Sequence, residues 1–289
     1  MEQLKNYTDE QIKDVAHEVL DKGFVYYTDQ DLSRTEYVDL CRKFGDTNDP
    51  QMGSRPEGKY WCNPDDAPDI SFVTGELDEH GKAKGLFGYA ELNWHSKGSI
   101  CHIDEFDEYV VALYCVKECP DTVLSVGNLR DPFAELSEEQ KNYWRSFQVQ
   151  HNPRGRYTIE WDKDDPNDKH TMYGNEANFT YPVDHKSTNE RMPLVNVHPQ
   201  DGKEFIFYQY VYFDKLWKDG VELTTDERDA VEKELQDLVV KSRFIDNFVF
   251  REGDLLIMDQ LYTMHRRSPI RDHNRLLWRT AFDYENIKW

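Results

Sequence analysis

The sequence predicts a mainly β domain with flanking helices. Short apolar runs of strand length recur along the chain, each bounded by polar or proline-containing stretches. A turn at residues 199–202 between two apolar segments indicates a β-hairpin. Amphipathic segments with capping residues indicate helices outside this β core. A chain of 289 residues buries a substantial core and contains no internal repeat, so we expect one domain over residues 1–289.

The first helix has the clearest sequence signal. Thr8 and Gln11 form a capping box, apolar residues follow at helical spacing, and Gly23 ends the helix. Capping serines or amphipathic spacing predict three further helices, over residues 34–44, 138–147 and 225–241.

The strands are predicted from apolar runs and from the turns between them. They cover residues 24–27, 70–73, 86–94, 110–116, 123–126, 194–197, 205–210, 248–250, 254–258 and 276–282. Two long polar segments separate them. We expect residues 46–69 to form a lid loop and residues 150–191 to form an insertion that covers one face.

The composition excludes several classes of function. A net charge of −21 repels nucleic-acid phosphates and anionic membrane surfaces, so neither is an expected partner. The five cysteines include no CxxC pair, which argues against a disulfide framework and a thiolate zinc site. No signal peptide or membrane-length apolar run occurs, so we expect a cytoplasmic protein.

Two histidines and two arginines are candidates for chemistry. His95 ends a predicted strand, and His265 lies far down the chain. Either histidine alone is more often a hydrogen-bonded structural residue than a metal ligand. Arg275 and Arg279 are evenly spaced on a predicted strand, so both guanidinium groups share one face and could clamp a carboxylate. Without the histidines, we would interpret these two arginines as surface residues that offset part of the negative charge of the protein.

Several segments of the chain resemble one known family. They are the opening strand and helix at residues 23–26 and 40–45, the segment 91–96 that ends in Trp94-His95-Ser96, the hairpin 193–202 and the C-terminal segment 253–279. These segments resemble taurine dioxygenase and related iron(II)/2-oxoglutarate-dependent oxygenases. The resemblance extends over nearly the whole chain, and the hairpin and the C-terminal segment are its most specific parts.

The resemblance implies a double-stranded β-helix, or jelly roll, with one Fe(II) held by two histidines and a carboxylate. His95 and His265 would be the metal ligands. Arg279 would bind the distal carboxylate of the co-substrate 2-oxoglutarate, with Arg275 as a second candidate, and the Thr122 hydroxyl would assist it. The family has two glycines before this threonine, whereas this chain has Pro120-Asp121. His198 in the hairpin would be structural.

Lys97 departs from the family pattern, because it stands two residues after His95 where the family has its carboxylate ligand. A protonated ammonium has no lone pair and repels a dication. Three explanations stay open. Another acid completes the site, from Asp104, Glu105 or Asp107. The ligand position is vacant, as in halogenating relatives of the family. Alternatively, the fold has lost iron chemistry and Lys97 fills the cavity or pairs with Glu91 or Asp259.

A second register is also open, since His102-Ile103-Asp104 is itself a His-x-Asp sequence. The spacing from His95 to Thr122 suits the family better, so His95, His265 and Lys97 remain the first choice for the catalytic positions. The resemblance implies hydroxylation, or a related oxidation, of a small polar molecule. The alternative is an iron-free binding protein for a small carboxylate. The sequence leaves the oligomeric state open.

Overall fold

The computed structural model describes residues 2–47, 66–79, 84–86, 91–96, 109–151, 191–210, 213–272 and 274–289. In this part of the chain, no helix is long and apolar enough to cross a membrane. The expected lid loop 46–69 and insertion 150–191 lie largely outside it, so both remain predictions.

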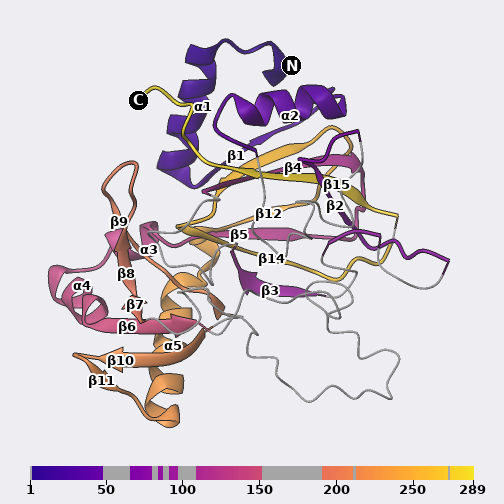
Figure 1. The fold of residues 1–289 in the computed structure, drawn as a ribbon. Helices are drawn as coiled ribbons and strands as arrows, with labels where there is room; N and C mark the ends of the chain where they lie inside the picture. The colour runs from indigo at the N-terminus through magenta and orange to yellow at the C-terminus, as the bar shows by residue number, and fades with distance from the viewer. Residues whose placement is uncertain are drawn as a thin grey trace.

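Two antiparallel sheets form the centre of the molecule (Figure 1). The first has five strands, in the order β1 (Phe24–Tyr27), β13 (Leu255–Asp259), β4 (Val110–Lys117), β15 (Leu276–Phe282) and β2 (Ser71–Thr74). The second has four, in the order β12 (Ile245–Phe248), β5 (Leu124–Asn128), β14 (Thr263–Arg267) and β3 (Leu92–His95). This arrangement confirms the expected mainly β jelly roll.

The inner faces of the two sheets enclose one apolar cluster. Alternate residues of β4, namely Val111, Leu113 and Cys115, pack in it against Leu124 and Val126 of β5. The other residues of β4 point to the opposite face, because side chains alternate along a strand. The register of the strands therefore tells which side chains reach the interior of the jelly roll.

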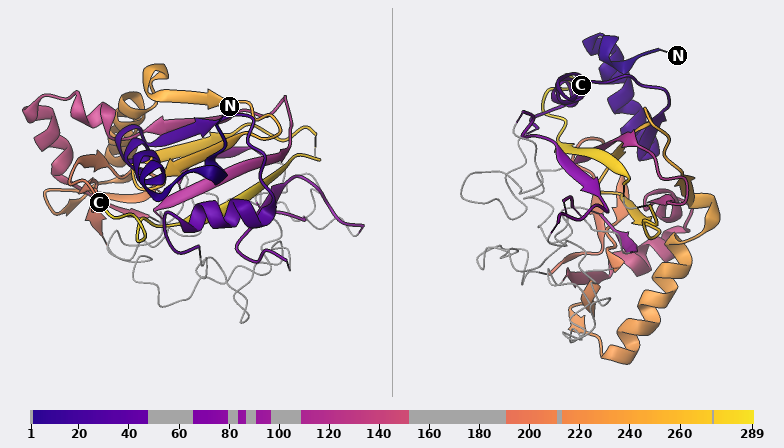
Figure 2. Two further views of the ribbon diagram at one scale, coloured as in Figure 1. Left: turned by 90° about the horizontal axis from the view of Figure 1, so that it is seen from above. Right: turned by 90° about the vertical axis from the view of Figure 1, so that its right-hand side faces the viewer.

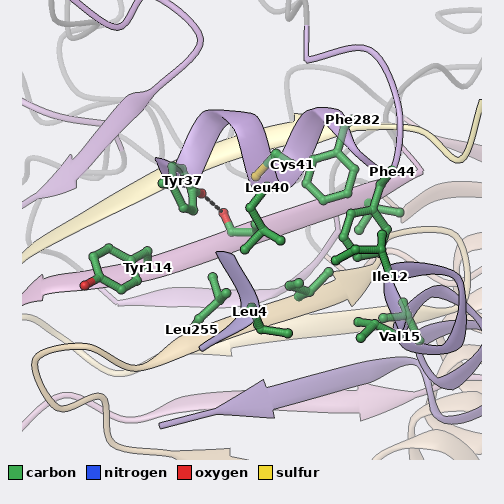
Figure 3. Packing of buried hydrophobic residues seen from close by; sticks show 14 of the residues in the cluster. Leu4, Ile12, Val15, Tyr37, Leu40, Cys41, Phe44, Tyr114, Leu255 and Phe282 are labelled. Atoms are coloured by element: carbon green, nitrogen blue, oxygen red, sulfur yellow. Dashed lines mark hydrogen bonds between the residues drawn. The ribbon is translucent and has the colours of Figure 1, made fainter. Parts of the chain in front are cut away.

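Two helices cover the outer face of the five-stranded sheet (Figures 1 and 2). Helix α1 (Asp9–Lys22) begins at the expected capping box and ends at Gly23, whose φ of 93° suits a residue without a Cβ. Helix α2 (Arg34–Arg42) follows β1. Figure 3 shows their packing, in which the buried Tyr37 hydroxyl donates to the Ala112 carbonyl oxygen at 2.9 Å. Two short 3₁₀ helices lie at Leu4–Asn6 and Ser242–Phe244.

A smaller group of elements packs beside the jelly roll, at the lower left of Figure 1. It contains a sheet of β11 (Val221–Glu222), β10 (Phe213–Lys218), β6 (Phe147–His151) and β7 (Met192–Pro193), and a hairpin of β8 (Val195–Val197) and β9 (Glu204–Ile206). Helices α3 (Asp131–Ala134), α4 (Glu138–Arg145) and α5 (Thr225–Val239) complete it. Its apolar cluster includes Trp94, Tyr262 and Met264 from the jelly roll, so the two parts share a core.

The structure differs from the prediction in several elements. The helix predicted over 138–147 ends at Arg145, because the Ser146 hydroxyl donates to the Tyr143 carbonyl oxygen and Phe147 turns into strand β6. The strand predicted over 248–250 lies earlier, at Ile245–Phe248, where it pairs with β5. Strand β14 was not predicted, since its polar residues 265–267 interrupt any apolar pattern.

Asp259 at the end of β13 is a fully buried carboxylate that accepts four hydrogen bonds. His198 Nε2 donates to it at 3.1 Å, the Tyr284 hydroxyl at 3.0 Å, and the backbone N–H groups of Leu261 and Tyr262 at 2.8 and 3.3 Å. His198 thus has the structural role that we expected, because it joins the hairpin of β8 and β9 to Asp259.

The substitution Tyr284→Phe should lower the free energy of unfolding by about 1.5–3 kcal/mol, because it removes a buried hydrogen bond to a carboxylate. Urea denaturation measures this loss. Tyr143→Phe is the matched control, since that hydroxyl donates to the exposed Glu234, and it should change stability by less than about 0.5 kcal/mol. Equal losses in the two variants would contradict a special role for the Asp259 contacts.

Candidate metal and anion site

The fold brings His95 and His265 together. They are direct partners in the antiparallel pairing of β3 with β14, so their side chains leave the same face of the sheet. Their ring centroids lie 4.3 Å apart, with the ring planes at 52°. Because His265 also pairs with Val126, a residue of the inner cluster, both imidazoles point into the jelly roll.

Both imidazoles are uncharged at neutral pH. Burial lowers the pKa of His95 to about 4 and that of His265 well below its usual value, and the positive charges of Arg267 and Arg279 add to both shifts. The Nδ1 atom of His95 lies 2.5 Å from the Asn93 carbonyl oxygen, so Nδ1–H donates to it. The Nε2 atom of His95 therefore keeps its lone pair, which is the form of histidine that binds metals.

The histidine pair fits two positions of a metal site. The Nδ1 atom of His265 is buried and has no hydrogen-bond partner in the described part of the chain. The described residues contain no group of three or more His, Cys, Asp and Glu side chains that could hold a metal ion. No described carboxylate or thiol therefore joins the two histidines in such a group. Lys97 and the alternative residues His102, Asp104, Glu105 and Asp107 all lie outside the described ranges.

Arg279 acts on both histidines, as Arg267 also does. It lies in β15 opposite Leu113, whose side chain is in the inner cluster, so Arg279 also faces inward. Its side chain is buried, and its charge helps to lower the pKa of both His95 and His265.

Arg275 lies just before β15, and its surroundings differ from those of Arg279. Burial lowers its pKa to about 10, while the nearby thiols of Cys115 and Cys119 oppose that shift. Its Nη1 atom is buried and has no hydrogen-bond partner in the described part of the chain. A buried guanidinium nitrogen in this state is suited to bind an anion.

Thr122 lies beside Cys119, with 3.1 Å between Oγ1 and Sγ. Its hydroxyl also lies 3.5 Å from the Pro269 carbonyl oxygen, to which it donates. Because Arg275 interacts with Cys119, Thr122 and Arg275 have a common neighbour. This end of the site, which we call the Thr122 end, therefore consists of Thr122, Cys119 and Arg275.

Arg267 is a site residue that the sequence reasoning missed. It follows His265 by two positions on β14 and pairs with Leu124, so it lies on the same inward face. Its side chain is 2% exposed, and burial together with the charge of Arg275 lowers its pKa to about 9. The even spacing from His265 could have indicated it, but only with β14 recognised as a strand.

The site thus combines two uncharged histidines with three buried arginines, of which Arg267 lies on β14, Arg279 on β15 and Arg275 just before β15. Such an arrangement can bind a metal ion at the histidines and a doubly charged acid beside it, because each buried guanidinium favours an anionic partner.

Solved structures of similar fold support this arrangement of sheets. A taurine dioxygenase from Burkholderia xenovorans has 17% identity and a TM-score of 0.67, with 97% of this chain and 83% of that chain covered. A putative alpha-ketoglutarate-dependent taurine dioxygenase from the same organism has 16% identity and a TM-score of 0.67, with 98% and 84% covered. AAD-2 in complex with Mn(II) and N-oxalylglycine has 15% identity and a TM-score of 0.71, with 98% and 92% covered.

No curated protein matches the chain by sequence. The model of one protein family, the taurine catabolism dioxygenase TauD, TfdA family, matches residues 1–281. This match covers nearly the whole chain and agrees with the fold. The chain belongs to the TauD, TfdA family of dioxygenases.

Proposed function

We propose that the protein is an oxygenase that depends on Fe(II) and 2-oxoglutarate and oxidises a small polar molecule, by hydroxylation or a related reaction. The observation that carries the proposal is the direct pairing of His95 with His265, with buried arginines on the same inward face. Membership of the TauD, TfdA family supports it.

His95, through Nε2, and His265 would hold the metal. Ferrous iron bound there would supply the chemistry with dioxygen that converts 2-oxoglutarate to succinate and carbon dioxide while a C–H bond of the substrate is oxidised. The protein keeps both imidazoles uncharged by burial and fixes the His95 ring through the Asn93 carbonyl oxygen. Both imidazoles lie on the face of the sheet that carries the apolar inner cluster, where we expect access of water to be limited.

We propose that Arg275 and Thr122 hold the distal carboxylate of 2-oxoglutarate, whereas Arg279 faces the end of the molecule nearer the metal. This assignment differs from the one that the resemblance implies, in which Arg279 is the first candidate for the distal carboxylate and Arg275 the second. It is supported by the electrostatic interaction of Arg275 with Cys119, the residue that Thr122 contacts, while Arg279, like Arg267, lowers the pKa of both histidines. N-oxalylglycine, which one neighbour binds together with Mn(II), is likewise a dicarboxylate.

Titration of the anaerobic protein with Fe(II) and 2-oxoglutarate should produce the charge-transfer absorption of the chelate, and admission of air should then yield succinate. His265→Ala should lose both signals, because it removes one of the two described ligands. His17→Ala should keep them, since His17 lies on α1 against Trp289. A wild-type protein that gives neither signal would refute the oxygenase and favour the iron-free binding protein.

The same titration tests position 97. Lys97→Asp adds a carboxylate two residues after His95 and removes a positive charge, so it should tighten Fe(II) binding by at least about tenfold. An unchanged affinity would mean that residue 97 does not contribute to the metal site.

Arg275→Met should weaken the binding of 2-oxoglutarate about 10- to 100-fold, because it removes a charge-assisted hydrogen bond. Isothermal titration with Mn(II) as the metal measures the affinity. Arg271→Met, which removes an exposed arginine four residues earlier, is the control and should have no effect. If Arg279→Met weakened the binding of 2-oxoglutarate and Arg275→Met did not, Arg279 would bind the distal carboxylate, as the resemblance implies.

A further inference from the structure

Arg267 is a third buried arginine in the site, beyond the two that the sequence suggested. It lies on β14, the strand that also carries His265. The adjacent Arg266 is exposed and lies over the Trp94 ring, with 5.1 Å from its guanidinium carbon to the ring centroid. The two arginines therefore lie on opposite faces of one strand, and only Arg267 reaches the interior.

The pairing of β14 with β5 places Arg267 close to the Thr122 end of the site. Arg267 is opposite Leu124, and beyond it the Ser268 N–H donates to the Val123 carbonyl oxygen at 3.0 Å. The Val123 N–H in turn donates to the Ser268 hydroxyl at 2.9 Å. One residue further, the Thr122 hydroxyl donates to the Pro269 carbonyl oxygen. These contacts hold the two segments together from Arg267 to Thr122.

Arg275, the residue before β15, acts on the same place. Both guanidinium groups interact with Cys119, and the charge of Arg275 acts on Arg267. Like charges in a protein interior repel each other, and a carboxylate between them offsets that repulsion. A carboxylate has two oxygen atoms with about four acceptor positions, so it can accept hydrogen bonds from two guanidinium groups and a hydroxyl.

We propose that Arg267 and Arg275 together hold one carboxylate of the acidic co-substrate at the Thr122 end of the site. The inference rests on the proposed function and adds a second arginine to the carboxylate site. Arg267 is then a specificity-determining residue that favours a 2-oxo acid with a second carboxylate over one without it.

Two ligands test the proposal. 2-Oxoglutarate has the distal carboxylate, whereas 2-oxopentanoate carries a methyl group in its place. Their affinities are measured anaerobically with Mn(II), by isothermal titration, for the wild type, Arg267→Met and Arg266→Met. Arg267→Met should weaken 2-oxoglutarate binding about 10- to 100-fold and change 2-oxopentanoate binding by less than about twofold. Arg266→Met removes the same charge from the outer face and should leave both affinities unchanged.

Arg267→Lys keeps the charge but loses the planar fork of donors, so it should bind 2-oxoglutarate more tightly than Arg267→Met and less tightly than the wild type. Equal losses for both ligands in Arg267→Met would overturn the proposal, as would the absence of any loss. In that case the wild type would still bind 2-oxoglutarate and the proposed function would stand. A wild type that binds neither ligand with Mn(II) would refute both.

Discussion

The pairing of His95 with His265 is the contact on which the rest of the site depends. Because β3 and β14 are adjacent antiparallel strands, backbone hydrogen bonds set the separation of the two imidazoles. Strand periodicity then places Arg267 on the same inward face, and the facing sheet supplies Arg279. Histidines held by strands in this way keep a more precise geometry than ligands on loops.

The position of β14 is set in turn by the buried Asp259. Its carboxylate accepts the backbone N–H groups of Leu261 and Tyr262, and the Thr263 hydroxyl donates to the Asp259 carbonyl oxygen. These bonds fix the turn that leads from β13 into β14. Because the same carboxylate binds His198 of the hairpin and Tyr284 near the C-terminus, segments distant in sequence converge there. A buried polar network of this kind stabilises one arrangement of the chain only when all its members are present.

Much of the fold could be predicted from the sequence, because β1, β4, β15, the hairpin and α1 carry strong local signals. Strand β14 could not be. Strand β14 is held by backbone pairing with β3 on one edge and β5 on the other. Its inward positions hold a histidine and an arginine, so the sequence has no apolar run there. The same polar character hid Arg267. The roles of Arg275 and Arg279 depend on the residues near each side chain, such as Cys119 for Arg275. These neighbours come from distant parts of the sequence, so the spacing of the two arginines does not predict them.

The acidic surface and the basic interior act over different distances. A net charge of −21 opposes the approach of an anionic co-substrate, but exposed charges are screened beyond about 8 Å at physiological ionic strength. Arg267, Arg275 and Arg279 are buried, where the dielectric constant is lower and screening is weak. Their charges would therefore govern the affinity of the acid that we propose as co-substrate, while the surface charge would affect mainly its rate of association. Because like charges repel each other, buried cations are stabilised by an anionic ligand, and this favours a dicarboxylate over a monocarboxylate at the site that we propose.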